Sequence, residues 1–126
     1  MASRRILLVE DSSTTRRMLA MMLESEGYEV RTAVDGVEGL VKAREEPRPE
    51  LIVTDYEMPE LDGPGLCRAV KADAGLRSIP VVVLTSHGDL AGKDSGADEV
   101  IQKPKSPGDT QEMFARIRAR LKGADA

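Results

Sequence analysis

Unbroken runs of aliphatic residues mark the strands that the sequence predicts. Residues 6–9, 51–53 and 81–84 contain only isoleucine, leucine and valine. A run without polar alternation is typical of a strand that is buried on both faces, as in a parallel sheet. The stretch 99–102 predicts a further strand, and the alternating stretch 28–33 predicts one nearer the sheet edge.

The segments between these strands predict helices, because their apolar residues recur at helical spacing. Ser and Pro residues supply the expected starts, and a glycine supplies one expected end. The expected helices run from a cap at Ser12 or Ser13 to Gly27, over 37–46, over 66–72, and from Ser106-Pro107 to about Leu121.

Each of these helices carries an apolar group that we expect to pack inward. Methionines at helical spacing usually belong to a core, and so do aliphatic residues spaced three and four apart. The expected inward groups are Met18, Leu19, Met21, Met22 and Leu23 in the first helix, Val37, Leu40 and Val41 in the second, Leu66, Ala69 and Val70 in the third, and Phe114, Ile117 and Leu121 in the last.

Strands that alternate with helices imply right-handed βαβ units. Such units build a parallel sheet with helices on both of its faces. No repeat or linker interrupts the alternation, so we expect one domain over residues 1–126, with an ordered core from about 4 to 121.

The charge balance and the cysteine count restrict the classes of function. A formal net charge of −4 argues against unaided binding to nucleic acid or to an anionic membrane, since both attract a basic excess. No apolar run approaches the length that a bilayer span needs. The single cysteine, Cys67, has no partner for an internal disulfide, and we expect a small apolar helix residue rather than a catalytic thiol. These features predict a cytoplasmic domain.

Residues suited to phosphoryl chemistry follow the predicted strands. Glu10 and Asp11 come after the first strand, and Asp55 ends the central one. In open α/β sheets, ligands bind beyond the carboxyl ends of the strands. Three carboxylates there repel one another unless a cation lies among them, and hard oxygen ligands suit Mg²⁺ (or Mn²⁺). Thr85 adds a hydroxyl donor and Lys103 a positive charge. An aspartate carboxylate is a known nucleophile in phosphoryl transfer.

Five short motifs occur in order along the chain, and their combination is far more specific than any one of them. They are Val9-Glu10-Asp11-Ser12, Asp55-Tyr56-Glu57-Met58-Pro59, Leu61-Asp62-Gly63, Thr85-Ser86 and Lys103-Pro104. Through them the chain resembles the receiver domain of two-component response regulators over essentially its whole length. Residues 13–17 resemble the first-helix entry of single-domain chemotaxis receivers. The resemblance implies a flavodoxin-like α/β fold, a doubly wound five-stranded parallel sheet of order 2-1-3-4-5 with five helices.

The resemblance also assigns roles to residues of the expected site. Asp55 is the implied phosphoacceptor, and Mg²⁺ is held by Glu10, Asp11, Asp55 and the backbone carbonyl of Glu57. Lys103 pairs with the acceptor or with its phosphoryl group, and the peptide bond before Pro104 is expected to be cis.

Further implied roles concern switching and phosphoryl lifetime. Thr85 is the implied switch hydroxyl, and Ser86 matches a position that must be small to leave the acceptor accessible. Glu57 and His87 match two positions that tune how long the phosphoryl group survives.

Two departures from the family pattern affect the expected output. Val100 stands where receivers usually carry Tyr or Phe, and it forms the expected switch region together with Pro104. The segment between Thr85 and Lys103 is about one helical turn shorter than is usual. It also contains three glycines, each of which costs about 1 kcal/mol relative to alanine inside a helix. We therefore predict a fourth helix that is short or irregular.

The leading hypothesis is a phosphoryl-accepting signalling switch, with at most slow self-catalysed phosphorylation and dephosphorylation. The expected donor is a sensor histidine kinase or a histidine phosphotransfer protein, which docks around Met18 on the first helix. The expected output is contact with a target protein, and the expected state is a monomer or weak dimer. One alternative is a pseudo-receiver that binds partners without phosphorylation. Another is a phosphatase of the haloacid dehalogenase type, which Glu57 opposes because those enzymes need an aspartate there.

Overall fold

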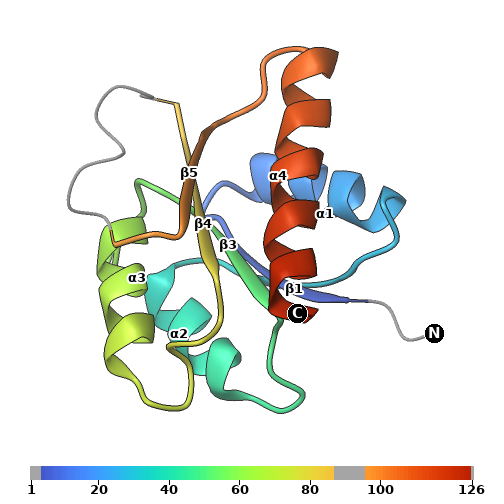
Figure 1. Ribbon diagram of the computed structural model, residues 1–126. Coiled ribbons are helices and arrows are strands. Elements are labelled where there is room, and N and C mark those ends of the chain that lie inside the picture. Colours follow the sequence, from blue (N-terminus) through green and yellow to red (C-terminus); the bar gives the residue numbers. More distant parts are fainter. Residues whose placement is uncertain (1–3, 87–95, 126) are drawn as a thin grey trace.

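The computed structural model describes residues 4–86 and 96–125, which form a five-stranded parallel sheet with flanking helices (Figure 1). The strand order is β2-β1-β3-β4-β5, so the predicted order and the flavodoxin-like α/β architecture are confirmed. The strands are β1 (Arg5–Val9), β2 (Glu29–Ala33), β3 (Leu51–Asp55), β4 (Val81–Thr85) and β5 (Glu99–Gln102). The described helices are α1 (Ser13–Ser25), α2 (Gly36–Arg44), α3 (Gly63–Ala72) and α4 (Pro107–Asp125).

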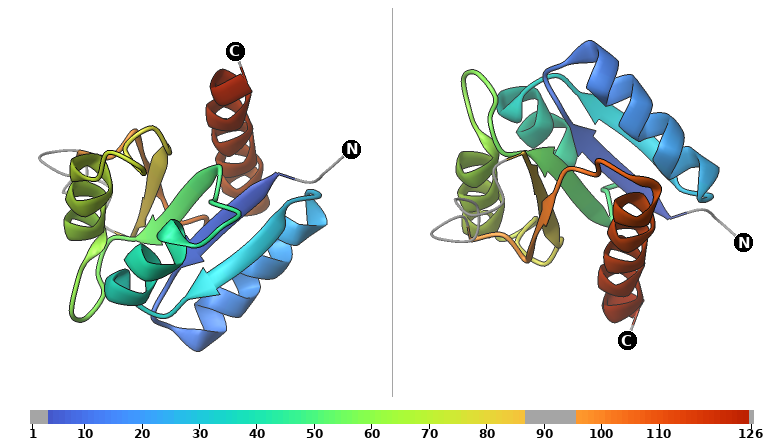
Figure 2. Two further views of the ribbon diagram at one scale, coloured as in Figure 1. Left: turned by 90° about the horizontal axis from the view of Figure 1, so that it is seen from below. Right: turned by 90° about the horizontal axis from the view of Figure 1, so that it is seen from above.

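Helices cover both faces of the sheet, and each face has its own core (Figure 2). α1 and α4 pack on one face, where Leu19 and Ile117 meet alternate residues of the central strands. α2 and α3 pack on the other face, where Leu66 and Val70 contribute. All five residues of β3 and of β4 are buried, as the unbroken aliphatic runs predict.

Four helices lie within the described part of the chain, whereas five were expected. The expected fourth helix falls on residues 87–95, which lie outside the described residues, so the label α4 belongs to the last helix. None of the helices in the described ranges is long and apolar enough to cross a bilayer.

The outer face of α1 carries methionines that were expected in the core. Leu19 and Leu23 lie one turn apart and point into the core, at 2% and 1% exposure. Met18 and Met21 are 49% and 63% exposed, while Met22 is half-buried against the core. The prediction is wrong for Met18 and Met21, because the leucines take the inward direction of this helix.

α2 faces the sheet with small residues rather than with its valines. Val37 and Val41 are 52% and 53% exposed, while Gly39 is buried and Leu40 packs partly against the core. A Cβ atom on Gly39 would lie 2.9 Å from Cγ2 of Val9. The predicted inward direction of Val37 and Val41 is therefore wrong, because the helix approaches β1 too closely for a branched side chain to fit between them.

α3 starts three residues earlier than predicted, since a capped turn precedes it. The Gly65 N–H donates to Oδ1 of Asp62 at 2.8 Å, and the Gly63 N–H donates to the Tyr56 carbonyl at 2.9 Å. A Cβ atom on Gly63 would lie 2.5 Å from the Asp55 carbonyl oxygen. The glycine therefore allows the loop after β3 to fold closely against the end of that strand.

α4 runs back along the sheet from the carboxyl ends of the strands. Its first turn is capped by Ser106, whose Oγ accepts the Asp109 N–H at 3.2 Å. Further along, the Arg120 guanidinium binds Glu99, the first residue of β5, with Nε 3.1 Å from Oε2. Figure 1 accordingly shows the end of α4 on the side of the molecule where β1 begins.

Candidate functional site

Four neighbouring strands end at one edge of the sheet and bring the predicted site residues together. Asp55 ends β3 and Thr85 ends β4, while Glu10 follows β1 and Lys103 follows β5. The backbone ladder fixes their level, because the Tyr56 N–H donates to the Leu84 carbonyl at 2.9 Å and the Lys103 N–H to the Thr85 carbonyl at 2.7 Å. The predicted convergence at the carboxyl edge is thus present in the structure.

Three carboxylates form a cluster at this edge. Glu10, Asp11 and Asp55 each place one oxygen within 4.8 Å of the others. Glu10 and Asp55 are buried, at 2% and 8% exposure, while Asp11 is exposed. Burying two like charges side by side is costly without a cation between or beside them.

Lys103 supplies a cation to the two buried carboxylates. Its Nζ lies 3.0 Å from Oδ1 of Asp55 and 3.2 Å from Oε1 of Glu10. Burial acts to lower the pKa of Lys103, but the hydrogen bonds and charges of Asp55 and Glu10 outweigh it and raise the pKa above its ordinary value. Lys103 is therefore firmly protonated and bridges both acids.

The ion pair with Lys103 does not fully offset the cost of burying the negative charge of Glu10. Burial raises the pKa of Glu10 above its ordinary value, and the neighbouring Asp55 charge adds to the effect. The Ser12 N–H, which donates to Oε2 of Glu10 at 3.2 Å, and the Lys103 ammonium both act against this rise without reversing it. One ammonium does not balance three carboxylates, so the cluster attracts a further cation.

Hydrogen bonds to the backbone hold the loop between β1 and α1, which carries the candidate metal ligands Glu10 and Asp11. Ser12 caps α1, because its Oγ accepts the Thr15 N–H at 3.3 Å. From the first turn of the helix, Nη1 of Arg16 donates to the carbonyls of Glu10 at 2.9 Å and of Asp11 at 3.4 Å. The sequence did not lead us to Arg16 as a site residue. The feature that could have indicated it is a long hydrogen-bond donor placed about one turn after the helix cap, within reach of the preceding loop.

A small pocket of about 160 Å³ opens beside the acceptor carboxylate. Thr85 is buried in its wall, whereas Ser86 and Glu57 are exposed. Oδ1 of Asp55 also accepts the Tyr56 N–H at 2.9 Å, which orients the carboxylate. The lining residues are Asp55, Tyr56, Glu57, Thr85, Ser86 and Lys103.

The remaining predicted site residues lie outside this cluster or outside the described residues. Val100 is half-buried on β5, opposite Val83, and packs against the core on the α2 and α3 face. His87 falls outside the described residues. The described cis peptide bond is Glu46–Pro47, so the expectation of a cis bond before Pro104 is wrong; the trans form is the ordinary one for X–Pro bonds.

The donor set of the cluster fits a hard divalent cation. Three carboxylate oxygens within 4.8 Å of one another are the ligands that Mg²⁺ takes together with waters and a phosphate oxygen. The described residues of the cluster include no thiolate or imidazole that would favour a softer metal. The site is therefore consistent with Mg²⁺.

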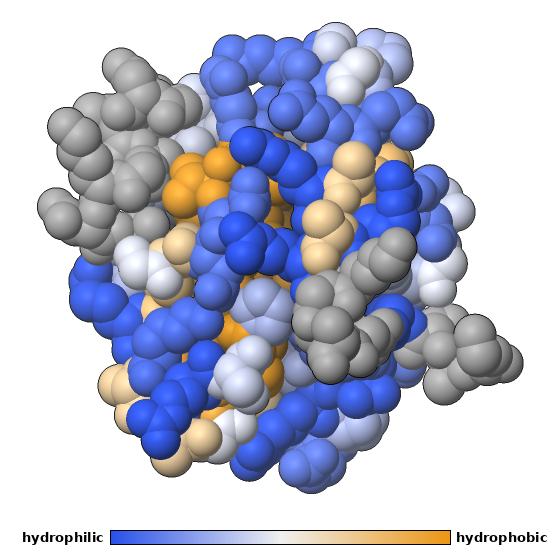
Figure 3. All heavy atoms as spheres, viewed as in Figure 1, coloured by the Kyte–Doolittle hydropathy of each residue, from blue (hydrophilic) through white to orange (hydrophobic). Residues whose placement is uncertain are grey.

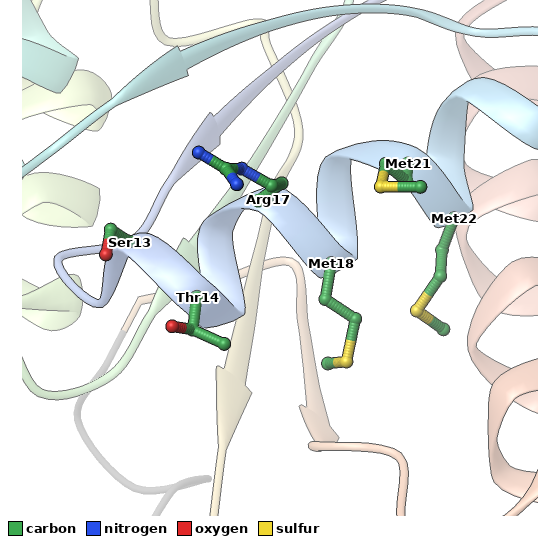
Figure 4. Close-up of a pocket in the computed structure, with 6 residues that line it drawn as sticks. All are labelled: Ser13, Thr14, Arg17, Met18, Met21 and Met22. Atoms are coloured by element: carbon green, nitrogen blue, oxygen red, sulfur yellow. The ribbon is translucent and has the colours of Figure 1, made fainter.

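The surface offers a larger hollow along α1, separate from the acidic edge. Its volume is about 430 Å³, and Figure 4 shows Thr14, Met18 and Met22 in a row along one side of the helix. Arg17 projects on the other side of the same helix (Figure 4). The face seen in Figure 3 is by contrast mostly hydrophilic, with apolar residues over β4 and β5.

Known proteins resemble this chain over nearly all of its length. It is 38% identical over 125 residues to the DNA-binding response regulator MtrA of Mycobacterium tuberculosis, an alignment that covers 96% of this chain and 52% of MtrA. The chain thus spans about half the length of the curated relatives that it matches first.

Solved structures share the fold at high similarity. The chemotaxis protein CheY4 of Vibrio cholerae is 33% identical, with a TM-score of 0.78 over 91% of this chain and 98% of that one. The response regulator TrrA of Thermotoga maritima, solved in complex with Mg²⁺ and BeF, is 27% identical, with a TM-score of 0.83 over 93% of this chain and 98% of that one.

The family description that matches the sequence covers almost all of the sheet and helices. It is the response regulator receiver domain, and it matches residues 6–117. That range contains the acidic cluster, Thr85 and Lys103. Receivers are phosphoacceptors rather than enzymes in the usual sense, and they partner with histidine kinases. The chain belongs to the receiver domain family of two-component response regulators.

Proposed function

We propose that this receiver is a phosphoryl-accepting signalling switch and that Asp55 is the acceptor in a Mg²⁺-dependent reaction. One observation carries the proposal. A nearly buried carboxylate ends the central strand within 4.8 Å of two further acid ligands and 3.0 Å from an ammonium group. The TrrA relative, which shares the fold, was solved with Mg²⁺ and BeF bound.

The geometry at Asp55 supports a nucleophilic role for one of its oxygens. The Lys103 and Tyr56 contacts described above both go to Oδ1, so we assign the attack to Oδ2. A bond forms between Oδ2 and phosphorus while the bond from phosphorus to the donor's leaving atom breaks, and the leaving atom keeps the electron pair. Catalysis of such a step is mainly positioning and charge neutralisation.

Metal and lysine divide the charge neutralisation between them. Glu10, Asp11, Asp55 and the backbone carbonyl of Glu57 would hold the Mg²⁺ ion, which neutralises the phosphoryl oxygens when bound. Lys103 orients the acceptor before transfer and neutralises the phosphoryl group afterwards. Its ammonium already lies at hydrogen-bond distance from Asp55.

The other pocket residues are proposed to read or limit the phosphorylated state. Thr85 lies in the pocket wall, and its hydroxyl donates a hydrogen bond to a phosphoryl oxygen. Ser86 leaves the acceptor open to donors because its side chain is small. Glu57 and His87 are proposed to tune the lifetime of the acyl phosphate, and Val100 with Pro104 forms the switch region on the last strand and its end.

The proposed donor is a sensor histidine kinase or a histidine phosphotransfer protein. Its docking surface is the outer face of α1, where Met18 and Met21 are about half exposed or more and line a hollow of about 430 Å³ (Figure 4). Exposed methionines suit such contacts, because flexible thioethers adapt to a partner's surface. The signal then leaves through contact with a target protein.

Incubation with acetyl phosphate and Mg²⁺, followed by intact-protein mass measurement, tests the proposal. The wild type is expected to gain the mass of one phosphoryl group, and to lose it in hydroxylamine. Asp55→Ala and a sample with excess chelator are expected to gain none. An unmodified wild type would contradict the proposal and favour the pseudo-receiver, which the valine at position 100 supports.

A further inference from the structure

We infer that Arg16 is a positioning residue for the metal site, because it ties the backbone of two acid ligands to the first turn of α1. This inference rests on the proposed function, since it concerns the Mg²⁺ affinity of the same cluster. Arg16 touches neither the acceptor carboxylate nor the pocket beside it in the contacts described here. It acts through the loop that carries Glu10 and Asp11.

The contact joins two consecutive carbonyls to one guanidinium nitrogen. Nη1 of Arg16 lies 2.9 Å from the Glu10 oxygen and 3.4 Å from the Asp11 oxygen. The Arg16 N–H also donates to the Ser12 carbonyl at 2.8 Å, which places Arg16 in the first hydrogen-bonded turn of the helix. The arginine therefore closes a ring between the helix and the loop that precedes it.

The two ligands in this loop differ in what else holds them. Glu10 is buried, its N–H donates to the Ala33 carbonyl at 3.0 Å, and its carboxylate binds Lys103. Asp11 is exposed, so packing does not restrict its side chain. A fixed carbonyl direction at Asp11 limits where its Cβ and carboxylate point, and the Arg16 contact supplies that restraint.

The sign of the effect separates positioning from simple charge. A positive charge near a cation site opposes cation binding, so loss of an arginine charge on its own strengthens Mg²⁺ binding. Loss of a positioning contact weakens it. Arg17, one residue further along, carries the same charge and projects away from the Thr14, Met18 and Met22 row (Figure 4). It is a matched control for the charge alone.

The experiment measures Mg²⁺ affinity in the absence of any phosphodonor. The chain contains two tyrosines and no tryptophan, and Tyr56 lines the acceptor pocket, so intrinsic tyrosine fluorescence reports on the site. A parallel titration with Mn²⁺, followed by the electron paramagnetic resonance of the free ion, does not depend on Tyr56. The variants are Arg16→Met, Arg16→Lys, Arg17→Met and Asp11→Asn.

We expect Arg16→Met to weaken Mg²⁺ binding by on the order of tenfold, as losses of contacts that orient metal ligands do. Arg17→Met is expected to bind as the wild type does or slightly more tightly. Arg16→Lys keeps the charge and a donor group on a shorter side chain, so it is expected to bind more tightly than Arg16→Met. Thermal unfolding without metal checks that each variant folds, and Arg16→Lys serves in place of Arg16→Met if the latter does not.

Two results would overturn the inference, and they differ in what else they affect. If Arg16→Met binds Mg²⁺ as tightly as Arg17→Met does, Arg16 has no positioning role, while the proposed function stands. The second result is a wild type without saturable Mg²⁺ binding, or with binding that Asp11→Asn leaves unchanged. Either finding would refute the metal site itself and the proposed function with it.

Discussion

Asp55 and Asp11 belong to the same acidic cluster, but different parts of the molecule hold them in place. Asp55 ends β3, a strand buried throughout its length between β1 and β4. Asp11 is exposed in the short connection between β1 and α1, where the Arg16 guanidinium reaches its carbonyl. Apolar packing positions the acceptor, whereas polar contacts position its exposed neighbour.

The difference separates two kinds of sensitivity within one site. A defect in the sheet lowers the stability of the whole fold before it alters the chemistry. A defect in the loop changes ligand geometry at little cost to the fold, because few apolar contacts are lost. Mutations in the sheet should therefore change mainly the stability of the fold, and mutations in the loop mainly the Mg²⁺ affinity.

The largest effect is expected from a cavity under the acceptor strand. Ile52→Ala removes most of a side chain that is fully buried in β3 and leaves a cavity in its place. We expect the free energy of unfolding to fall by about 3 kcal/mol. Mg²⁺ affinity in the folded protein should change little. Val41→Ala, on the exposed face of α2, is the control and should change stability by less than about 0.5 kcal/mol. Equal losses in urea denaturation would refute this contrast.

Lys103→Met is expected to have the next largest effect, because it removes the cation from two buried carboxylates. Without Mg²⁺ at neutral pH, we expect the free energy of unfolding to fall by about 2 kcal/mol. This is less than the loss expected from breaking a fully buried ion pair, because the lysine is partly exposed. Lys105→Met, at an exposed position two residues later, is the control.

The pH dependence of Lys103 has a definite sign. Its pKa is raised in the folded state, so its stabilisation is complete below pH 10.5, the ordinary value, and is lost as the pH rises through the raised value. Denaturation curves at alkaline pH should show this loss in the wild type and not in Lys103→Met. The same loss in both proteins would rule out Lys103 as its source.

A smaller loss is expected from the cap of α1 in the loop region. Ser12→Ala removes the oxygen that accepts the Thr15 N–H, which should cost about 1 kcal/mol. Ser13→Ala lies inside the helix and is the matched control, expected to be nearly neutral. If Ser13→Ala destabilises the protein more than Ser12→Ala does, the assigned cap is wrong.

Glu10→Gln should have the smallest effect on stability, and in the opposite direction. Because the pKa of Glu10 is raised above 4.5, the folded state holds its proton more tightly than the unfolded chain does. The cost in stability therefore grows as the pH rises from 4.5 and is complete above the raised value. The neutral amide should stabilise the metal-free protein at pH 7, with the gain vanishing below pH 4.5, while Mg²⁺ binding weakens. Destabilisation at pH 7 would contradict this.

The strands and the site were predictable because they depend on simple rules. An aliphatic run such as 81–84 is stable only where both of its faces are covered, which requires a central position in a parallel sheet. Parallel strands then place Glu10, Asp55, Thr85 and Lys103 at one edge, whatever the details of the helices. Hydropathy and connection order were sufficient for the strands and for their shared edge, whereas the order of the strands was implied by the family resemblance.

The helix faces and Arg16 were not predictable in the same way. Hydropathy ranks Val37 and Val41 above Gly36 and Gly39, but the distance from α2 to β1 decides which residues face the sheet. That distance exists only in the folded molecule. The Arg16 contacts likewise depend on the angle at which α1 leaves the loop, which side-chain chemistry does not fix.

The direction of α4 has a practical consequence for binding studies. The helix carries the chain from the carboxyl edge back to the side where β1 begins, and Arg120 meets the start of β5 near its far end. A biotin or fluorophore attached beyond α4 is therefore held away from Asp55 and from the loop of Glu10 and Asp11. The protein can be immobilised by that end on a sensor chip with its acidic edge facing the solution.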